Sequence, residues 1–139
     1  MAVCFESAAA RHLTDAGLLW SEGRFDNAFY LAGYVVECSL KAVIVHSGGN
    51  PSDFGHKLVK LEREGLDVAV ALLPGLVRYR PEAVKIKALA DRWSVGGRYE
   101  STGETTRELA EKGIDLARHV FEVSVGGMFL DGLLAELPE

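Results

Sequence analysis

Apolar residues recur at helical spacing along most of this chain. Over residues 5–22 they return every three or four positions, which places them on one face of a helix: Phe5, Ala9, Leu13, Ala16 and Trp20. Gly23 follows and is expected to end this helix. A second helix is predicted from residues 24–26 to about residue 47. It is apolar on most sides, so we expect it at the centre of the fold.

The middle of the chain has a less regular pattern. Residues 56–64 are typical of a short helix that Gly65 closes. Residues 67–73 alternate like a short strand, but they also fit a helical turn. We favour the helix because no partner strand is visible elsewhere in the sequence. Residues 82–93 predict a further helix, and residues 94–103 a glycine-rich loop.

The C-terminal part predicts one more long helix. Ser101 with Glu104, and Thr105 with Glu108, have the spacing of a capping box. The helix should continue to about residue 123, and Gly126–Gly127 should break it. Residues 124–139 form a C-terminal tail, and its segment 128–137 is apolar enough to dock on the body of the protein or on a second subunit.

Three long helices and one or two short ones, joined by short connections, predict an up-and-down bundle of four to five helices. We therefore expect an all-α protein with a single domain over residues 1–139, in which residues 5–123 form the core. A length of 139 residues suits one such domain.

Composition narrows the classes of function. The formal net charge is −5, which makes the chain a poor nonspecific binder of nucleic acid. Basic residues nevertheless gather in the middle, where they form either a local anion site or a solvated face: Lys57, Lys60, Arg63, Arg78, Arg80, Lys85 and Lys87.

Two cysteines, Cys4 and Cys38, are expected to be free thiols. The chain shows no Cys-x-x-Cys, His-Glu-x-x-His or Glu-x-x-His motif, so we expect no metal and no cofactor. It also shows neither a secretory signal nor an apolar run of about 20 residues. We therefore expect a cytoplasmic location and no membrane contact.

Five residues are candidates for a ligand site. Glu37 and Lys41 lie one turn apart on the predicted central helix, as an orienting ion pair or as a polar spot in a cleft. His56 is a general-base or anion-contact candidate, although a lone histidine often only caps a helix or packs. Arg98 and Tyr99 follow two glycines in a loop. Arginine suits phosphate contacts and tyrosine suits stacking, but the arginine could instead cap a helix or pair with Glu37.

Three segments of the chain resemble the HEPN superfamily. Residues 23–43, with Glu-Cys-Ser-Leu-Lys-Ala at their end, are similar to its central helix. Gly55-His56-Lys57-Leu58 resembles the His-x-Leu segment that follows, and Arg98-Tyr99 resembles the Arg-Tyr before the last helix. The resemblance implies a helical bundle, usually dimeric, that binds nucleotides or RNA. Many such proteins partner a minimal nucleotidyltransferase as a toxin–antitoxin pair.

The active toxins of this superfamily are metal-independent ribonucleases, whose motif is an arginine followed after four to six residues by a histidine. None of the four histidines here has an arginine at that spacing. The sequence therefore favours a binding module that lacks the ribonuclease motif, forms a homodimer and contacts a nucleotidyltransferase, a nucleotide or RNA. The alternative is a ribonuclease with a nonstandard site built from His56 and Arg98.

Overall fold

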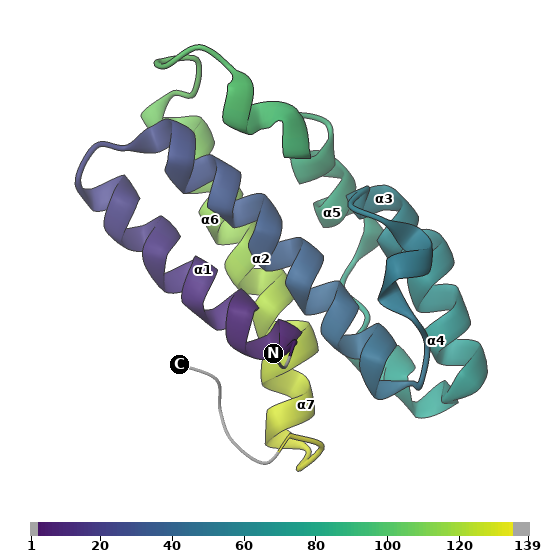
Figure 1. Cartoon of the computed structure of the whole chain (residues 1–139). Coiled ribbons are helices and arrows are strands. Elements are labelled where there is room, and N and C mark those ends of the chain that lie inside the picture. Colours follow the sequence, from purple (N-terminus) through teal and green to yellow (C-terminus); the bar gives the residue numbers. More distant parts are fainter. Residues whose placement is uncertain (1–2, 135–139) are drawn as a thin grey trace.

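The computed structural model describes residues 3–134, and every regular element in that part of the chain is helical. Three long helices form the body: α1 (Phe5–Ser21), α2 (Phe25–His46) and α6 (Arg107–Phe121). Both α1 and α6 pack along α2 and also contact each other (Figure 1). The predicted all-helical bundle is therefore confirmed, and α1 and α2 begin and end within about one residue of their predicted limits.

Helix α2 is the core of the bundle, as its sequence predicts. Ala28, Ala32, Val35 and Leu40 are fully buried along it. An 18-residue window of α2 has a mean hydropathy of 1.6, so this helix could span a membrane by length and composition alone. Most of that window, 78%, is already buried inside the bundle. Its apolar character is thus accounted for by packing against α1 and α6.

The middle of the chain forms one irregular helix rather than two separate pieces. It comprises α3 (Leu58–Lys60), a π-helical turn (Leu61–Gly65) and α4 (Leu66–Leu72). The predicted closure at Gly65 is wrong, because this glycine continues the helix. A β-carbon there would lie 2.7 Å from the Ile44 side chain, so Gly65 allows close packing on α2. The preference for helix over strand at residues 67–73 is confirmed.

A second series of short helices connects the irregular middle helix to α6. It comprises a 3₁₀ turn (Pro74–Tyr79), α5 (Ala83–Ala90) and a 3₁₀ turn (Val95–Tyr99) inside the predicted glycine-rich loop. A further 3₁₀ turn (Pro51–Phe54) follows α2. Neither predicted capping box begins α6. Instead, the side chain of Thr106 accepts a hydrogen bond from the Leu109 backbone N–H at 3.1 Å.

The last helix does not break at Gly126–Gly127 as predicted. It passes through a π-helical turn (Glu122–Gly126) into α7 (Gly127–Leu130). A β-carbon on Gly127 would lie 2.9 Å from the Tyr79 ring, so this glycine serves close packing. Met128 is fully buried, which places the first part of the predicted tail on the body. The rest of that tail, residues 135–139, lies outside the described residues.

Candidate functional site

Three of the five predicted residues meet on one side of α2. The Glu37 carboxylate lies 3.2 Å from the Lys41 ammonium, and both side chains are more than nine-tenths buried. His56, in the turn just before the irregular middle helix, places Nδ1 3.1 Å from both oxygens of that carboxylate. Because a carboxylate only accepts hydrogen bonds, Nδ1 carries a proton. The imidazole itself is 59% exposed, so its Nε2 edge can meet solvent or a ligand.

The other two predicted residues, Arg98 and Tyr99, lie in the 3₁₀ turn Val95–Tyr99, which packs beside the N-terminal part of α2. A guanidinium nitrogen of Arg98 donates to the Tyr30 hydroxyl at 3.4 Å, and that hydroxyl lies 3.0 Å from the hydroxyl of Tyr34. The guanidinium also stacks on the ring of Tyr99, 4.7 Å from its centroid. Tyr99 is 78% exposed. Arg98 therefore neither caps a helix nor pairs with Glu37, but presents an exposed cation beside an exposed aromatic ring.

Helical geometry puts both groups on one face. Tyr30, Tyr34, Glu37 and Lys41 follow one another at spacings of four, three and four residues, which is a single stripe along α2. Tyr30 and Glu37 are about 10 Å apart along the helix axis, since each residue adds about 1.5 Å of rise. The structure thus aligns the five predicted residues, but it does not bring Arg98 into contact with His56.

Burial changes the acid–base character of this stripe. Burial, with the hydrogen bond from Tyr30 next in size, raises the pKa of Tyr34 to about 12, so its hydroxyl keeps its proton at neutral pH. The ring of His12 on α1 packs against Tyr34 at 5.9 Å between centroids. Burial, and then the charge of Arg11, lower the pKa of His12. His12 is therefore a neutral packing partner at neutral pH.

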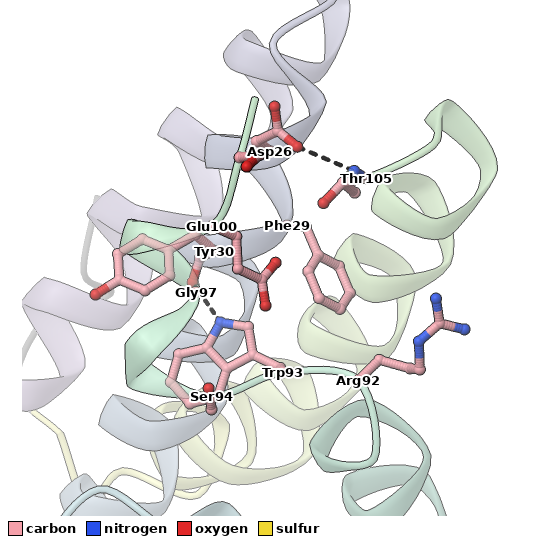
Figure 2. A pocket seen from close by; sticks show the side chains of 10 residues that line it. Asp26, Phe29, Tyr30, Arg92, Trp93, Ser94, Gly97, Glu100 and Thr105 are labelled. Atoms are coloured by element: carbon pink, nitrogen blue, oxygen red, sulfur yellow. Dashed lines mark hydrogen bonds between the residues drawn. The ribbon is translucent and has the colours of Figure 1, made fainter. Parts of the chain in front are cut away.

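The loop that carries Arg98 is anchored at its first end by Trp93. The indole lies directly on Gly33 of α2, where a β-carbon would overlap its ring atoms Cε2, Cδ2 and Nε1. The indole N–H donates to the Tyr30 carbonyl at 2.8 Å (Figure 2). Trp93 is only 6% exposed. Gly33 is thus a notch in the core helix that receives this ring, and sequence reasoning did not identify it.

Asp26 anchors the other end of that loop. Its carboxylate accepts hydrogen bonds from the backbone N–H of Gly103 at 2.8 Å and of Thr105 at 3.0 Å. These backbone hydrogen bonds lower the pKa of Asp26. The first turn of α2 and the end of the loop are therefore held together by a charged acceptor.

Between these two anchors the surface is hollowed. One small hollow, with a cavity volume of about 30 Å³, is bordered by Phe29, Tyr30 and Trp93 (Figure 2). Glu100 borders this hollow and also the two adjoining ones. Neither a hydrogen bond nor an ion pair engages the Glu100 carboxylate within residues 3–134. Sequence reasoning missed this residue, although it directly follows Arg98-Tyr99.

The basic residues of the middle segment divide into two groups. Arg78, Arg80 and Lys87 pair with acidic side chains. Lys57, Lys60 and Arg63 border a shallow surface depression on the irregular middle helix. Arg78 and Lys87 are exposed and fit the solvated-face interpretation, whereas Arg80 is largely buried and holds the buried Glu62 carboxylate. Across residues 3–134 no group of histidine, cysteine or acidic side chains could hold a metal ion.

A comparison with known protein families matches nearly the whole helical body. The sequence profile of the HEPN domain matches residues 5–128, from the start of α1 into α7. The chain belongs to the HEPN family. Neither a curated protein nor a solved structure gives a match to it. The resemblance inferred from the three segments is thereby confirmed. The match also includes residues 124–128, which the sequence analysis assigned to the C-terminal tail.

Proposed function

We propose that this HEPN domain is a binding module for a nucleotide or RNA, and that it contacts its ligand through the face of α2 and the Arg98–Tyr99 loop. The stacked, exposed pair of Arg98 and Tyr99 is the observation that carries the proposal. A guanidinium offers hydrogen bonds and charge to a phosphate, and an exposed aromatic ring offers a surface on which a base can stack.

The support of this pair by the fold strengthens the proposal. Hydrogen bonding, first to Tyr30 and then to Tyr99, raises the pKa of Arg98 above its ordinary range, so the cation is permanent. The loop is fixed at Trp93 and at Asp26, which reduces the entropy lost when a ligand binds. The overall negative charge then makes binding depend on this local cation rather than on the general field of the protein.

Fluorescence anisotropy with a labelled single-stranded RNA tests this function. We expect Arg98→Ala to weaken binding about tenfold at low salt, by the loss of a phosphate contact and its stacked ring. Arg118→Ala is the matched control, since Arg118 is a similarly exposed arginine on α6 that pairs with Asp115. Equal binding by the wild-type, Arg98→Ala and Arg118→Ala proteins would refute the proposal.

The module is proposed to act as a homodimer that also contacts a minimal nucleotidyltransferase, as the family resemblance implies. Light scattering after gel filtration measures the oligomeric state. Co-purification with a nucleotidyltransferase encoded beside this gene tests the partner. A monomer at all accessible concentrations, or failure to capture that protein, would contradict these two parts of the proposal.

A second candidate function is metal-independent ribonuclease activity, and the His56–Glu37 contact favours it. With Nδ1 held by Glu37, the Nε2 atom of His56 can accept the proton of a ribose 2′-hydroxyl. That oxygen would attack the adjacent phosphorus, and the 5′-oxygen would leave with a proton from water. Cleavage of transfer RNA in EDTA that disappears in His56→Ala and Arg98→Ala would establish this activity. No cleavage by wild-type protein would exclude it.

A further inference from the structure

The outer surface of the irregular middle helix changes character after Asp67. Up to that residue it turns mainly charged side chains to solvent, such as Lys60, Arg63 and Asp67. Over residues 68–77, by contrast, the chain carries no polar side chain at all. Most of these residues are nevertheless exposed: Val68, Ala71, Leu72, Leu73, Pro74, Gly75 and Val77. Contiguous exposed apolar surface of this kind marks an interaction site on a soluble protein.

Packing on the bundle accounts for only part of this apolar stretch. Ala69 and Leu76 are buried and anchor the segment to the body. Val68 and Leu72 lie one turn apart on α4 and remain exposed, and Leu72 is 56% accessible to solvent. The solvent-facing positions of a helix at the surface of a bundle ordinarily carry polar side chains. The outward apolar residues are therefore not needed by the core and are available to a partner.

Helix α7 lies beside the end of this stretch and adds to its apolar surface. It contacts the 3₁₀ turn Pro74–Tyr79, and the Tyr79 hydroxyl donates a hydrogen bond to Asp131 at 2.6 Å. Figure 1 shows α4 and α7 at the same end of the bundle, where α2 finishes. Leu130 and Leu133 come just before and just after Asp131, and both are exposed. We call the surface of Val68, Leu72, Leu73, Val77, Leu130 and Leu133 the Leu72 face.

Acid–base pairs border the Leu72 face at both ends. At its start, the Asp67 carboxylate lies 2.7 Å from the Arg80 guanidinium. Arg80 also holds Glu62, whose side chain is buried beneath the surface. At its other end, the Arg78 guanidinium lies 3.6 Å from the Asp131 carboxylate. Each exposed pair has one charge of either sign, so this border favours neither a strongly basic nor a strongly acidic partner.

We propose that the Leu72 face is where two copies of this chain meet about a twofold axis. A twofold contact sets the same surface of each copy against itself. Two chains of net charge −5 repel each other, so they approach most easily at a face that brings no charge of its own. The mixed pairs at the border let each arginine approach a carboxylate of the other copy. The inference rests on the homodimer of the proposed function and names its interface.

Sedimentation equilibrium of the full chain over the micromolar range measures the dissociation constant of the dimer. Leu72→Glu places a carboxylate of each copy in the apolar face, so we expect that constant to rise about a hundredfold. Leu18→Glu is the matched control, because Leu18 is a leucine of similar exposure, 61%, on α1. It should leave the dimer intact. Circular dichroism checks that both variants are folded.

A charge exchange at the same position tests the twofold arrangement without relying on loss alone. Leu72 lies in the middle of the apolar stretch, so its two copies face each other across the proposed axis. Leu72→Lys by itself should also be monomeric. An equal mixture of the Leu72→Glu and Leu72→Lys proteins should form heterodimers, because opposite charges then meet. Misfolding cannot produce such a rescue, and its absence would overturn the twofold contact.

The remaining outcomes separate this inference from the proposed function. A wild-type protein that is monomeric at every concentration would overturn both the homodimer and the interface, and its co-sedimentation with phosphatidylcholine vesicles would identify a lipid surface as the occupant instead. A dimer that persists in Leu72→Glu would overturn the interface and leave the homodimer standing. RNA binding through Arg98 is measured separately by anisotropy, so its failure would not bear on the Leu72 face.

Discussion

Replacement of Gly33 by alanine tests how the Arg98 loop is held. In the middle of a helix, alanine normally stabilises relative to glycine by about 0.5–1 kcal/mol. At Gly33 the added methyl group would overlap the Trp93 ring, which is 6% exposed and hydrogen-bonded to Tyr30. The indole must then move. Removal of a buried tryptophan side chain costs about 3–5 kcal/mol, and part of that loss applies to a displaced ring.

We therefore expect Gly33→Ala to lower the free energy of unfolding by about 2–4 kcal/mol after the gain in helix propensity is subtracted. For a chain of this size the melting temperature should fall by roughly 10 °C. Gly17→Ala is the matched control, because Gly17 lies inside α1 and nothing stands within 4 Å of its added β-carbon. That substitution should stabilise by about 0.5–1 kcal/mol.

Urea unfolding followed by circular dichroism measures both variants. Tryptophan fluorescence in a Trp20→Phe background reports on Trp93 directly, and its emission should shift to the red in Gly33→Ala as the indole meets water. If Gly33→Ala stabilised the protein as Gly17→Ala does, with unchanged emission, the indole could not lie on Gly33. The Arg98 loop would then not be anchored by the Trp93 indole.

Four further substitutions or treatments probe the remaining polar groups. Ser39 is fully buried and its hydroxyl has no hydrogen-bond partner within the described residues, so Ser39→Ala should raise the free energy of unfolding by about 1 kcal/mol in urea titrations. The lowered pKa of Asp26 means that its contribution to stability is present above the ordinary value of 3.8 and is lost as pH falls through the lower native value. Asp26→Asn should accordingly reduce the acid dependence of the melting temperature in that range, and an unchanged dependence would contradict this. Arg80 holds the buried Glu62 carboxylate at 3.1 Å, so Arg80→Ala should destabilise by about 3–5 kcal/mol, whereas a change below about 1 kcal/mol would show that Glu62 finds water instead. Burial raises the pKa of Cys38 to about 11, so iodoacetamide at pH 8 should modify this thiol only after unfolding, as mass spectrometry of native and unfolded protein would show.

The sequence was sufficient to predict those parts of the fold that depend on local pattern. The limits of α1 and α2 follow from apolar spacing, and Gly23 ends α1 with a positive φ of 76°. Errors arose where a glycine serves packing rather than termination. Gly65 and Gly127 lie inside continuous helices, against Ile44 and Tyr79. A sequence shows that a glycine is present but not whether a distant side chain occupies the space it leaves.

In the candidate site, too, contacts between neighbours on one helix could be predicted, whereas contacts between distant segments could not. Glu37 and Lys41 are one helical turn apart, so their contact could be predicted from spacing alone. The contact of His56 with Glu37 joins residues 19 positions apart and depends on how the irregular middle helix packs. The cleft around Glu100 depends on contacts across more than 60 residues, such as that between Trp93 and Tyr30. No local pattern encodes such contacts.

Residues in the first turns of α2 therefore position the proposed ligand surface, although most of them do not contact the ligand themselves. Asp26 holds the end of the loop, Tyr30 contacts both Arg98 and Trp93, and Gly33 makes room for the indole. A change at any of these positions should move Arg98 and Glu100 together, because both lie between the two anchors. Binding of RNA should thus fall in Gly33→Ala, whereas Gly17→Ala, which displaces no side chain, should leave it unchanged. This difference separates the anchoring of the Arg98 loop from a general change in the stability of a helix.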